Sequence, residues 1–146
     1  MTRVATLFAV ESNIKQDKLI WDKQSFELFG VSPKEDLDTF NRWAACVHPD
    51  DLATQLELIE QAKQQGNEFA TEYRVIWPDQ TIHYINSNAI TVHDKKGDLE
   101  RMVGTNIDVT LRKQAELLLK KREETLSNAN LKLEQAIRMK DEFLAI

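Results

Sequence analysis

The sequence has one cysteine, four glycines and three prolines in 146 residues, and it has no long apolar run. The single cysteine, Cys46, excludes an internal disulfide and is in keeping with a reducing compartment. No stretch approaches the roughly 18 consecutive apolar residues of a membrane-spanning helix, and the N-terminus lacks the apolar segment of a signal peptide. We therefore expect a cytoplasmic location for this chain, although a longer parent protein could still be anchored in a membrane.

The sequence also offers little for a metal, a nucleic acid or a reaction. His48, His83 and His93 form no tight metal-ligand spacing with one another or with Cys46, so we expect no metal site. The formal net charge of −5 gives no reason to expect nucleic-acid binding. We recognise no nucleophile–base pair, phosphate-binding loop or metal cluster, and we therefore expect no enzyme activity in this chain itself.

The residues that break regular structure are confined to the first part of the chain. All glycines and prolines lie before Thr105, whereas residues 110–146 are rich in good helix formers. We predict two domains, 1–109 and 110–146, the second being a single helix. Thirty-seven helical residues span roughly 55 Å, while a domain of 110 residues has a radius of gyration near 13 Å. Such a helix cannot lie wholly against its own domain and needs a partner.

Apolar residues recur at heptad spacing along this predicted helix, which indicates a coiled coil. Leucines stand every seven residues, small residues fill the alternate positions, and one arginine interrupts them. The predicted seam consists of Leu119, Arg122, Leu126, Ala129, Leu133, Ala136 and Ile137. A parallel, two-stranded coiled coil would make the protein a homodimer, to which the first domain could also contribute. The alternative is a helix that folds back on its own domain.

The first domain shows an α+β pattern. Residues 68–109 alternate apolar and polar side chains around two turns, which predicts a three-stranded antiparallel meander. Two short strands, two short helices and one longer helix are predicted upstream, at Val4–Val10, Lys18–Asp22, Ser25–Phe29, Asp38–Cys46 and Pro49–Gln65. His48 is expected to help fix the start of the longer helix. One antiparallel sheet covered by helices is the predicted architecture.

Two groups of residues are candidates for function. Asn86 and Asn88 share the parity of Tyr84 and Ile90, and they point at a ligand or buried water, or mark a bulge or an exposed stretch. Aromatic residues line a small-molecule pocket or simply fill the core. The possible ligand pocket comprises Trp43, Tyr84, Asn86 and Asn88.

The second group stands at the junction of the two domains. Thr110 suits the N-cap of the long helix, and Asp108 ends the last strand, where we expect it to pair with Arg74. We predict that Asp108, Thr110 and Arg74 couple the sheet to the helix. The simpler interpretation is a helix cap worth about 1 kcal/mol.

A series of short motifs in this order resembles the PAS family, in its fold-3 form, over about residues 4–116. These motifs are Leu28-Phe29-Gly30, Val47-His48-Pro49-Asp50-Asp51-Leu52, Glu72-Tyr73-Arg74, Pro78-Asp79, Gly104, Asp108-Val109-Thr110 and Lys113. The family usually has glycine where Gln80 stands. The resemblance implies a five-stranded antiparallel sheet with flanking short helices and a sensory role. The resemblance does not specify a ligand or a cofactor.

The same resemblance argues against two familiar PAS cofactors. The helix from Pro49 to Gln65 contains no histidine that could ligate haem. Photosensory relatives bind flavin through cysteine in an Asn-Cys-Arg-Phe-Leu-Gln context, whereas Cys46 lies in Ala45-Cys46-Val47-His48. Haem and covalent flavin are therefore not expected, and Cys46 is interpreted as a small buried hydrophobe.

Residues 139–146, Met139-Lys140-Asp141-Glu142-Phe143-Leu144-Ala145-Ile146, look like the start of the dimerisation helix of sensor histidine kinases. This resemblance implies a two-component system, in which the phospho-accepting histidine and the ATP-binding domain follow downstream. A response regulator would be a partner only through that kinase part. The alternatives are a ligand-free structural dimerisation module, or a PAS input to another output domain such as a cyclase.

Overall fold

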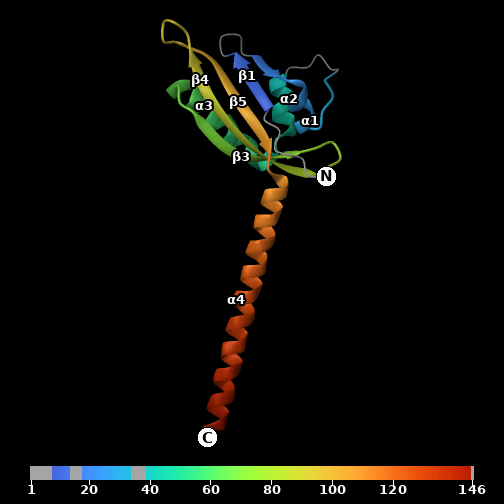
Figure 1. The fold of residues 1–146 in the computed structure, drawn as a ribbon, viewed down its shortest axis with the longest axis vertical. Coiled ribbons are helices and arrows are strands. Elements are labelled where there is room, and N and C mark those ends of the chain that lie inside the picture. Colours follow the sequence, from blue (N-terminus) through green and yellow to red (C-terminus); the bar gives the residue numbers. More distant parts are fainter. Residues whose placement is uncertain (1–7, 14–17, 34–38, 146) are drawn as a thin grey trace. The chain divides into compact units, whose positions relative to one another are not determined.

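A computed structural model describes residues 8–13, 18–33 and 39–145. The chain divides into two compact units that meet between Thr110 and Leu111. The first unit contains an antiparallel sheet with strand order β2-β1-β5-β4-β3, and three helices cover one of its faces (Figure 1). Its elements are β1 (Phe8–Asn13), β2 (Lys18–Trp21), α1 (Lys23–Leu28), α2 (Thr39–Cys46), α3 (Pro49–Gln65), β3 (Phe69–Ile76), β4 (Ile82–His93) and β5 (Leu99–Asp108).

The three C-terminal strands form the predicted antiparallel meander, which is confirmed. Tyr73 of β3 pairs with Ile85 of β4, and Ser87 of β4 pairs with Asn106 of β5. Strands β1 and β2 extend the sheet from the far edge of β5. β1 runs from Phe8 to Asn13, and the first residues of the strand predicted at Val4–Val10 lie outside the described residues.

The turn between β3 and β4 departs from the family pattern at Gln80. This residue has a φ of 69°, a left-handed conformation that glycine adopts without strain. The turn compensates through Asp79, whose carboxylate accepts hydrogen bonds from the backbone N–H and the hydroxyl of Thr81. An Asx-type turn therefore closes this hairpin in place of the usual glycine turn.

The longer helix α3 begins and ends as its sequence predicts. His48 is the N-cap, and its Nδ1 accepts the backbone N–H of Asp50 at 3.2 Å. Pro49 occupies the first turn, where its missing N–H removes no helical hydrogen bond. Gly66 ends the helix with a φ of 64°.

The hydrophobic core lies between the sheet and the three helices. Trp21 and Phe29 stack with ring centroids 4.6 Å apart, and Phe29, Val75 and Ile85 are fully buried. The buried cluster consists of Trp21, Leu28, Phe29, Trp43, Cys46, Val47, Tyr73, Val75 and Ile85. Burial raises the pKa of the Cys46 thiol, in keeping with a hydrophobic role for this residue.

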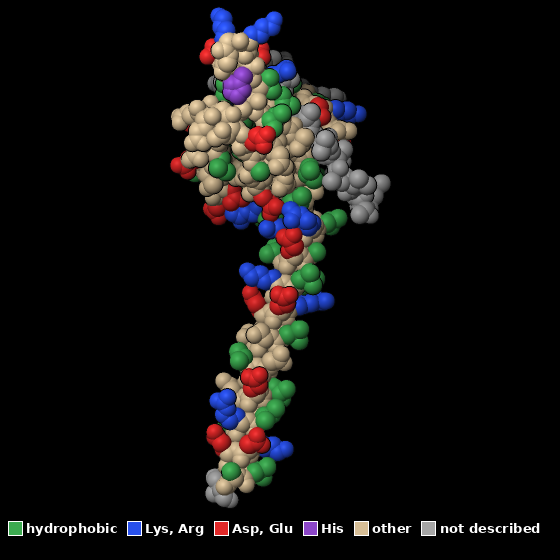
Figure 2. Space-filling model, turned by 60° about the vertical axis from the view of Figure 1, so that its left-hand side comes forward, with side chains coloured by type: hydrophobic (Ala, Val, Ile, Leu, Met, Phe, Trp, Pro, Cys, Tyr) green, Lys and Arg blue, Asp and Glu red, His purple; other side chains and the backbone are tan. Residues whose placement is uncertain are grey.

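Helix α4 (Thr110–Leu144) is long and contains no buried residue. Apolar side chains recur along it between charged ones (Figure 2). Among the predicted seam residues, Leu119, Leu126, Leu133 and Ile137 are all more than half exposed in the single chain. The predicted long C-terminal helix is confirmed, whereas its pairing into a coiled coil remains a prediction.

No described helix is apolar enough over a sufficient length to cross a membrane.

Candidate functional site

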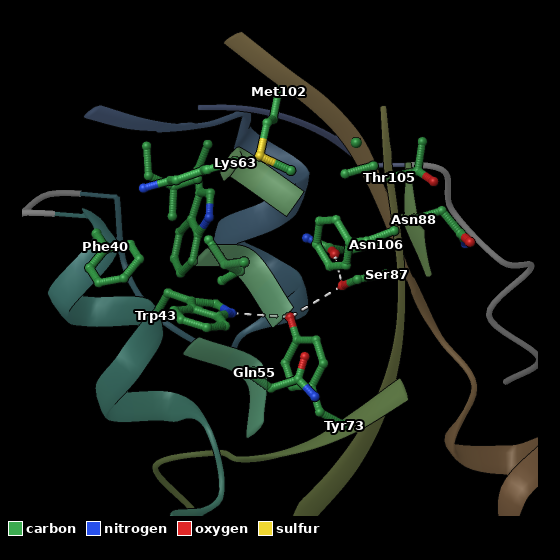
Figure 3. Close-up of a pocket in the computed structure, with 16 residues that line it drawn as sticks. Phe40, Trp43, Gln55, Lys63, Tyr73, Ser87, Asn88, Met102, Thr105 and Asn106 are labelled. Carbon is green, nitrogen blue, oxygen red and sulfur yellow. Dashed lines mark hydrogen bonds between the residues drawn. The ribbon is translucent and has the colours of Figure 1, made fainter. Parts of the chain in front are cut away.

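A cavity of about 110 Å³ lies between the sheet and helices α2 and α3 (Figure 3). Strands β3, β4 and β5 each contribute residues to one wall, so all three strands of the meander line the cavity. Its apolar lining is Leu19, Trp21, Phe40, Trp43, Ile59, Phe69, Ala89, Met102 and Gly104. Its polar lining is Gln55, Lys63, Tyr73, Ser87, Asn88, Thr105 and Asn106.

A chain of hydrogen bonds crosses the cavity wall from α2 to β5 (Figure 3). The indole Nε1–H of Trp43 donates to Oη of Tyr73 at 3.1 Å, and this oxygen lies 3.3 Å from Oγ of Ser87. Ser87 also hydrogen-bonds Oδ1 of Asn106. Since a carbonyl oxygen only accepts, Ser87 donates its single proton to Asn106 and receives the proton of Tyr73. One directional chain thus joins a helix to three strands.

Burial keeps the Tyr73 hydroxyl protonated. It raises the pKa of the Tyr73 phenol, and the hydrogen bond that Trp43 donates to it opposes this rise in pKa. A neutral phenol retains the proton that the chain of hydrogen bonds requires. The hydrogen bonds from Trp43 to Asn106 therefore stay intact around neutral pH.

Gln55 brings a second buried amide to the cavity from α3. It is buried, and its Nε2 donates to Oγ1 of Thr71 at 3.0 Å. Sequence reasoning missed Gln55, Ser87 and Asn106. Their signal is positional, because Ser87 shares the parity of Ile85, and Asn106 pairs with Ser87 across the strands.

The predicted pocket residues separate in the structure. Trp43 and Asn88 line the cavity, but Asn88 is exposed and its amide donates to Oδ1 of Asn86 at 2.7 Å. Neither Tyr84 nor Asn86 is among the described residues that line it. The physical reason is the parity of β4. Ile85 and Ser87 face the helices, whereas Ile82 and Ile90 are exposed by 43% and 50%, so the even-numbered face was the wrong one to assign to the core.

Asp108 and Thr110 meet at the start of α4, in a different arrangement from the predicted cap. Oδ1 of Asp108 accepts the backbone N–H of Thr110 at 2.9 Å and also the Thr110 hydroxyl. Oγ1 of Thr110 in turn accepts the backbone N–H of Tyr84 at 2.9 Å. Asp108 is thus the capping side chain, and Thr110 ties the start of the helix to β4.

The predicted pairing of Arg74 with Asp108 is wrong. The Arg74 guanidinium binds Asp51 of α3 at 2.7 and 2.9 Å, and the backbone N–H of Arg74 donates to the same carboxylate. These hydrogen bonds hold the pKa of Asp51 below its usual value. Strand β4 lies between β3 and β5, so Arg74 and Asp108 stand two strands apart, about 9–10 Å in the sheet.

His83 is the neighbour of Asp108 that sequence reasoning missed. Its Nδ1 lies 3.4 Å from Oδ2 of Asp108, and its Nε2 lies 2.9 Å from Oγ1 of Thr81. Its ring stacks on Trp77 at 3.8 Å between centroids. This stacking orients His83 toward the junction. Among the described residues, no group of three or more His, Cys, Asp or Glu side chains is placed to hold a metal ion.

The sequence and the fold of this chain are similar to those of known proteins. The family described as PAS fold matches residues 18–106. The probable diguanylate cyclase DgcE of Escherichia coli K12 is 33% identical over 104 residues, which are 71% of this chain and 9% of that protein. The methyl sulfide methyltransferase-associated sensor of Methanosarcina acetivorans is 30% identical over 74 residues, 50% of this chain and 7% of that protein. The chain thus spans less than a tenth of either relative.

Among solved structures, a sensory box histidine kinase/response regulator from Burkholderia thailandensis superposes with a TM-score of 0.69. It is 26% identical, and the match covers 85% of this chain and 92% of that one. The family match, the antiparallel sheet and the helices packed on one of its faces all agree. This chain belongs to the PAS-fold family.

Proposed function

We propose that this chain is the PAS sensory module of a larger signalling protein and relays its signal to an output domain through a coiled-coil dimer. Residues 1–109 are the sensory domain, and residues 110–146 are the relay. One observation carries the proposal: β5 leads directly from the cavity to α4. Asn106 lines the cavity, Asp108 caps the helix, and Thr110 begins it.

The physical basis of the relay is the spacing along β5. Residues i and i+2 of a strand point to the same face and lie about 7 Å apart. A ligand that moves Asn106 therefore acts two residues from Asp108, whose carboxylate holds the first N–H of α4. Thr110 links the same point to the backbone of β4. A small shift in the sheet thus has a direct route to the start of the helix.

The relay helix requires a second copy of itself. Its apolar side chains are exposed in the single chain, and in proteins most helical stability comes from packing of an amphipathic face. Leucines every seven residues form the seam of a parallel two-stranded coiled coil. Two packings of similar energy would allow a change in the sheet to alter register, rotation or splay of the two helices. Arg122 and the shift of the apolar line toward Ile137 are the places where such alternatives are most readily accommodated.

The output that we propose is histidine autophosphorylation in another part of a longer protein. It is supported by the similarity of residues 139–146 to histidine kinase dimerisation helices and by the Burkholderia histidine kinase structure. A diguanylate cyclase output is the second candidate, and the similarity to DgcE favours it. In either case this chain supplies input and coupling, and its own residues carry out no chemistry.

The test uses the full-length protein with Asp108→Ala and, as a matched control, Asp98→Ala in the turn between β4 and β5. Both proteins are assayed for ATP-dependent autophosphorylation and for diguanylate cyclase activity. We expect Asp108→Ala to change one of these outputs several-fold while Asp98→Ala does not. An unchanged output together with a lower unfolding temperature would reduce Asp108 to a helix cap and contradict the relay.

A further inference from the structure

The size of the cavity limits what it can bind. Its volume is about 110 Å³, whereas an apolar cavity of roughly 150 Å³ accepts a benzene molecule. The space therefore suits at most a single small ring. A flavin or a haem would require the core side chains to move apart.

The walls of the cavity favour a flat and uncharged molecule. Trp21, Phe40 and Trp43 present aromatic rings, which pack best against another planar group. No carboxylate is found among the described lining residues, so a buried cation would have no counter-charge. The one basic lining residue among those described, Lys63, already has an interaction within the protein. The lining therefore does not require an anionic ligand.

Asn106 provides a hydrogen-bond donor that faces the cavity. Its side chain is 7% exposed, and its Oδ1 is engaged by Ser87. No described residue accepts a hydrogen bond from its Nδ2, yet every fully enclosed polar side-chain atom in the described part of the chain has a partner. The Nδ2 nitrogen is therefore not fully enclosed, and because Asn106 lines the cavity, its N–H groups are available there to a ligand that carries an acceptor.

Gln55 provides a complementary acceptor from α3. Its Nε2 is engaged by Thr71, and no described residue donates to its Oε1. By the same reasoning this carbonyl oxygen is not fully enclosed and is available to a ligand in the cavity. The two amides thus present one donor, from β5, and one acceptor, from α3, to the same largely apolar cavity.

We propose that the cavity binds a small, neutral, planar heteroaromatic molecule that carries both a hydrogen-bond acceptor and a hydrogen-bond donor, and that Asn106 determines this specificity. The inference rests on the proposed sensory function and names the class of its signal. Because Asn106 also receives the hydrogen bond from Ser87, the ligand contacts the end of the chain that links α2 to β5.

The experiment compares two probes of similar size on the intact chain by calorimetry and NMR. One is 2-pyridone, a ring with an adjacent N–H and C=O, and the other is benzene. We expect 2-pyridone to bind with a dissociation constant on the order of 1 mM or tighter, within the limits for so few atoms, and benzene to bind at least tenfold more weakly. The side-chain amide resonances of Asn106 in the wild-type protein should shift with 2-pyridone and not with benzene.

Two variants complete the test. Asn106→Leu should weaken 2-pyridone binding at least tenfold and leave benzene binding unchanged or stronger, whereas Asn86→Leu, on the other face of the sheet, should alter neither. Benzene binding as tight as 2-pyridone, or 2-pyridone binding indifferent to Asn106→Leu, would overturn the inference. So would the failure of both probes to bind. If Asn106→Leu does not fold, the amide resonances of the wild-type protein decide. Dimerisation and output are measured separately, so the relay can stand when this ligand class fails.

Discussion

The PAS unit buries many of its apolar residues, whereas helix α4 leaves its apolar residues exposed. In the PAS unit nine buried residues, four of them aromatic, pack in one core. In α4 no residue is buried, and leucines are exposed along its length. One region is stabilised by its own tertiary contacts, whereas the other leaves its apolar side chains exposed in the single chain. One chain can thus combine a domain that has a hydrophobic core of its own with a helix that contains no buried residue.

The largest expected effect falls in the core of the PAS unit. Phe29 is fully buried and stacks on Trp21, so Phe29→Ala should lower the free energy of unfolding by about 3–5 kcal/mol. Tryptophan fluorescence during denaturant unfolding measures it. Leu131→Ala, at an exposed position of α4 away from the predicted seam, is the control and should change this value by less than about 0.5 kcal/mol. Equal losses would mean that the two regions do not differ in this way.

The next effect should appear in association and not in folding. Leu126→Asp places a charge in the predicted seam and should raise the dimer dissociation constant at least tenfold, or about 1.4 kcal/mol. Sedimentation equilibrium measures it. Leu131→Asp introduces the same charge outside the seam and should have a much smaller effect. A wild-type chain that stays monomeric at all concentrations would contradict the coiled coil and favour a helix folded back on its own domain.

A smaller effect concerns the link between α3 and β3, and it depends on pH. Since Arg74 lowers the pKa of Asp51 in the folded protein, the pair stabilises the fold above the unfolded pKa of about 3.9. That contribution is lost as the pH falls through the folded pKa of Asp51. Asp51→Asn should cost about 1–2 kcal/mol at neutral pH and flatten the acid limb of the stability profile below about pH 4. The exposed Asp50→Asn is the control, and an unchanged acid limb in Asp51→Asn would contradict the assignment.

The smallest expected effect is at Thr110, which begins α4 and hydrogen-bonds the backbone of β4. Thr110→Val keeps the shape of the side chain but removes the acceptor of the Tyr84 N–H. We expect a loss of about 1 kcal/mol, with faster hydrogen exchange of the Tyr84 amide and unchanged exchange in the middle of α4. If the Tyr84 amide stays protected, Thr110 does not join the helix to the sheet.

Much of this organisation follows from local sequence patterns. The scarcity of glycine and proline after Thr105, together with the helix formers that follow, predicts α4 because its hydrogen bonds join residues four apart. The turns at Pro78-Asp79 and around Gly97 predict the meander for a similar reason, since hairpins are local. His48, Pro49 and Gly66 predict the limits of α3, because caps act within one turn.

The site, by contrast, depends on contacts between residues far apart in the sequence. Parity in the sequence groups Asn86 with Tyr84 and Ile90, and only the packing of the helices decided that Ser87 and not Asn86 faces the cavity. The partner of Arg74 was decided by strand order, which places β4 between it and Asp108 and brings Asp51 of α3 to its side. Sequence by itself thus determined the elements and the division of the chain, because these rest on periodicity and local hydrogen bonds. Tertiary structure decided which amides line the cavity and which charges pair, because such contacts depend on how separate elements pack.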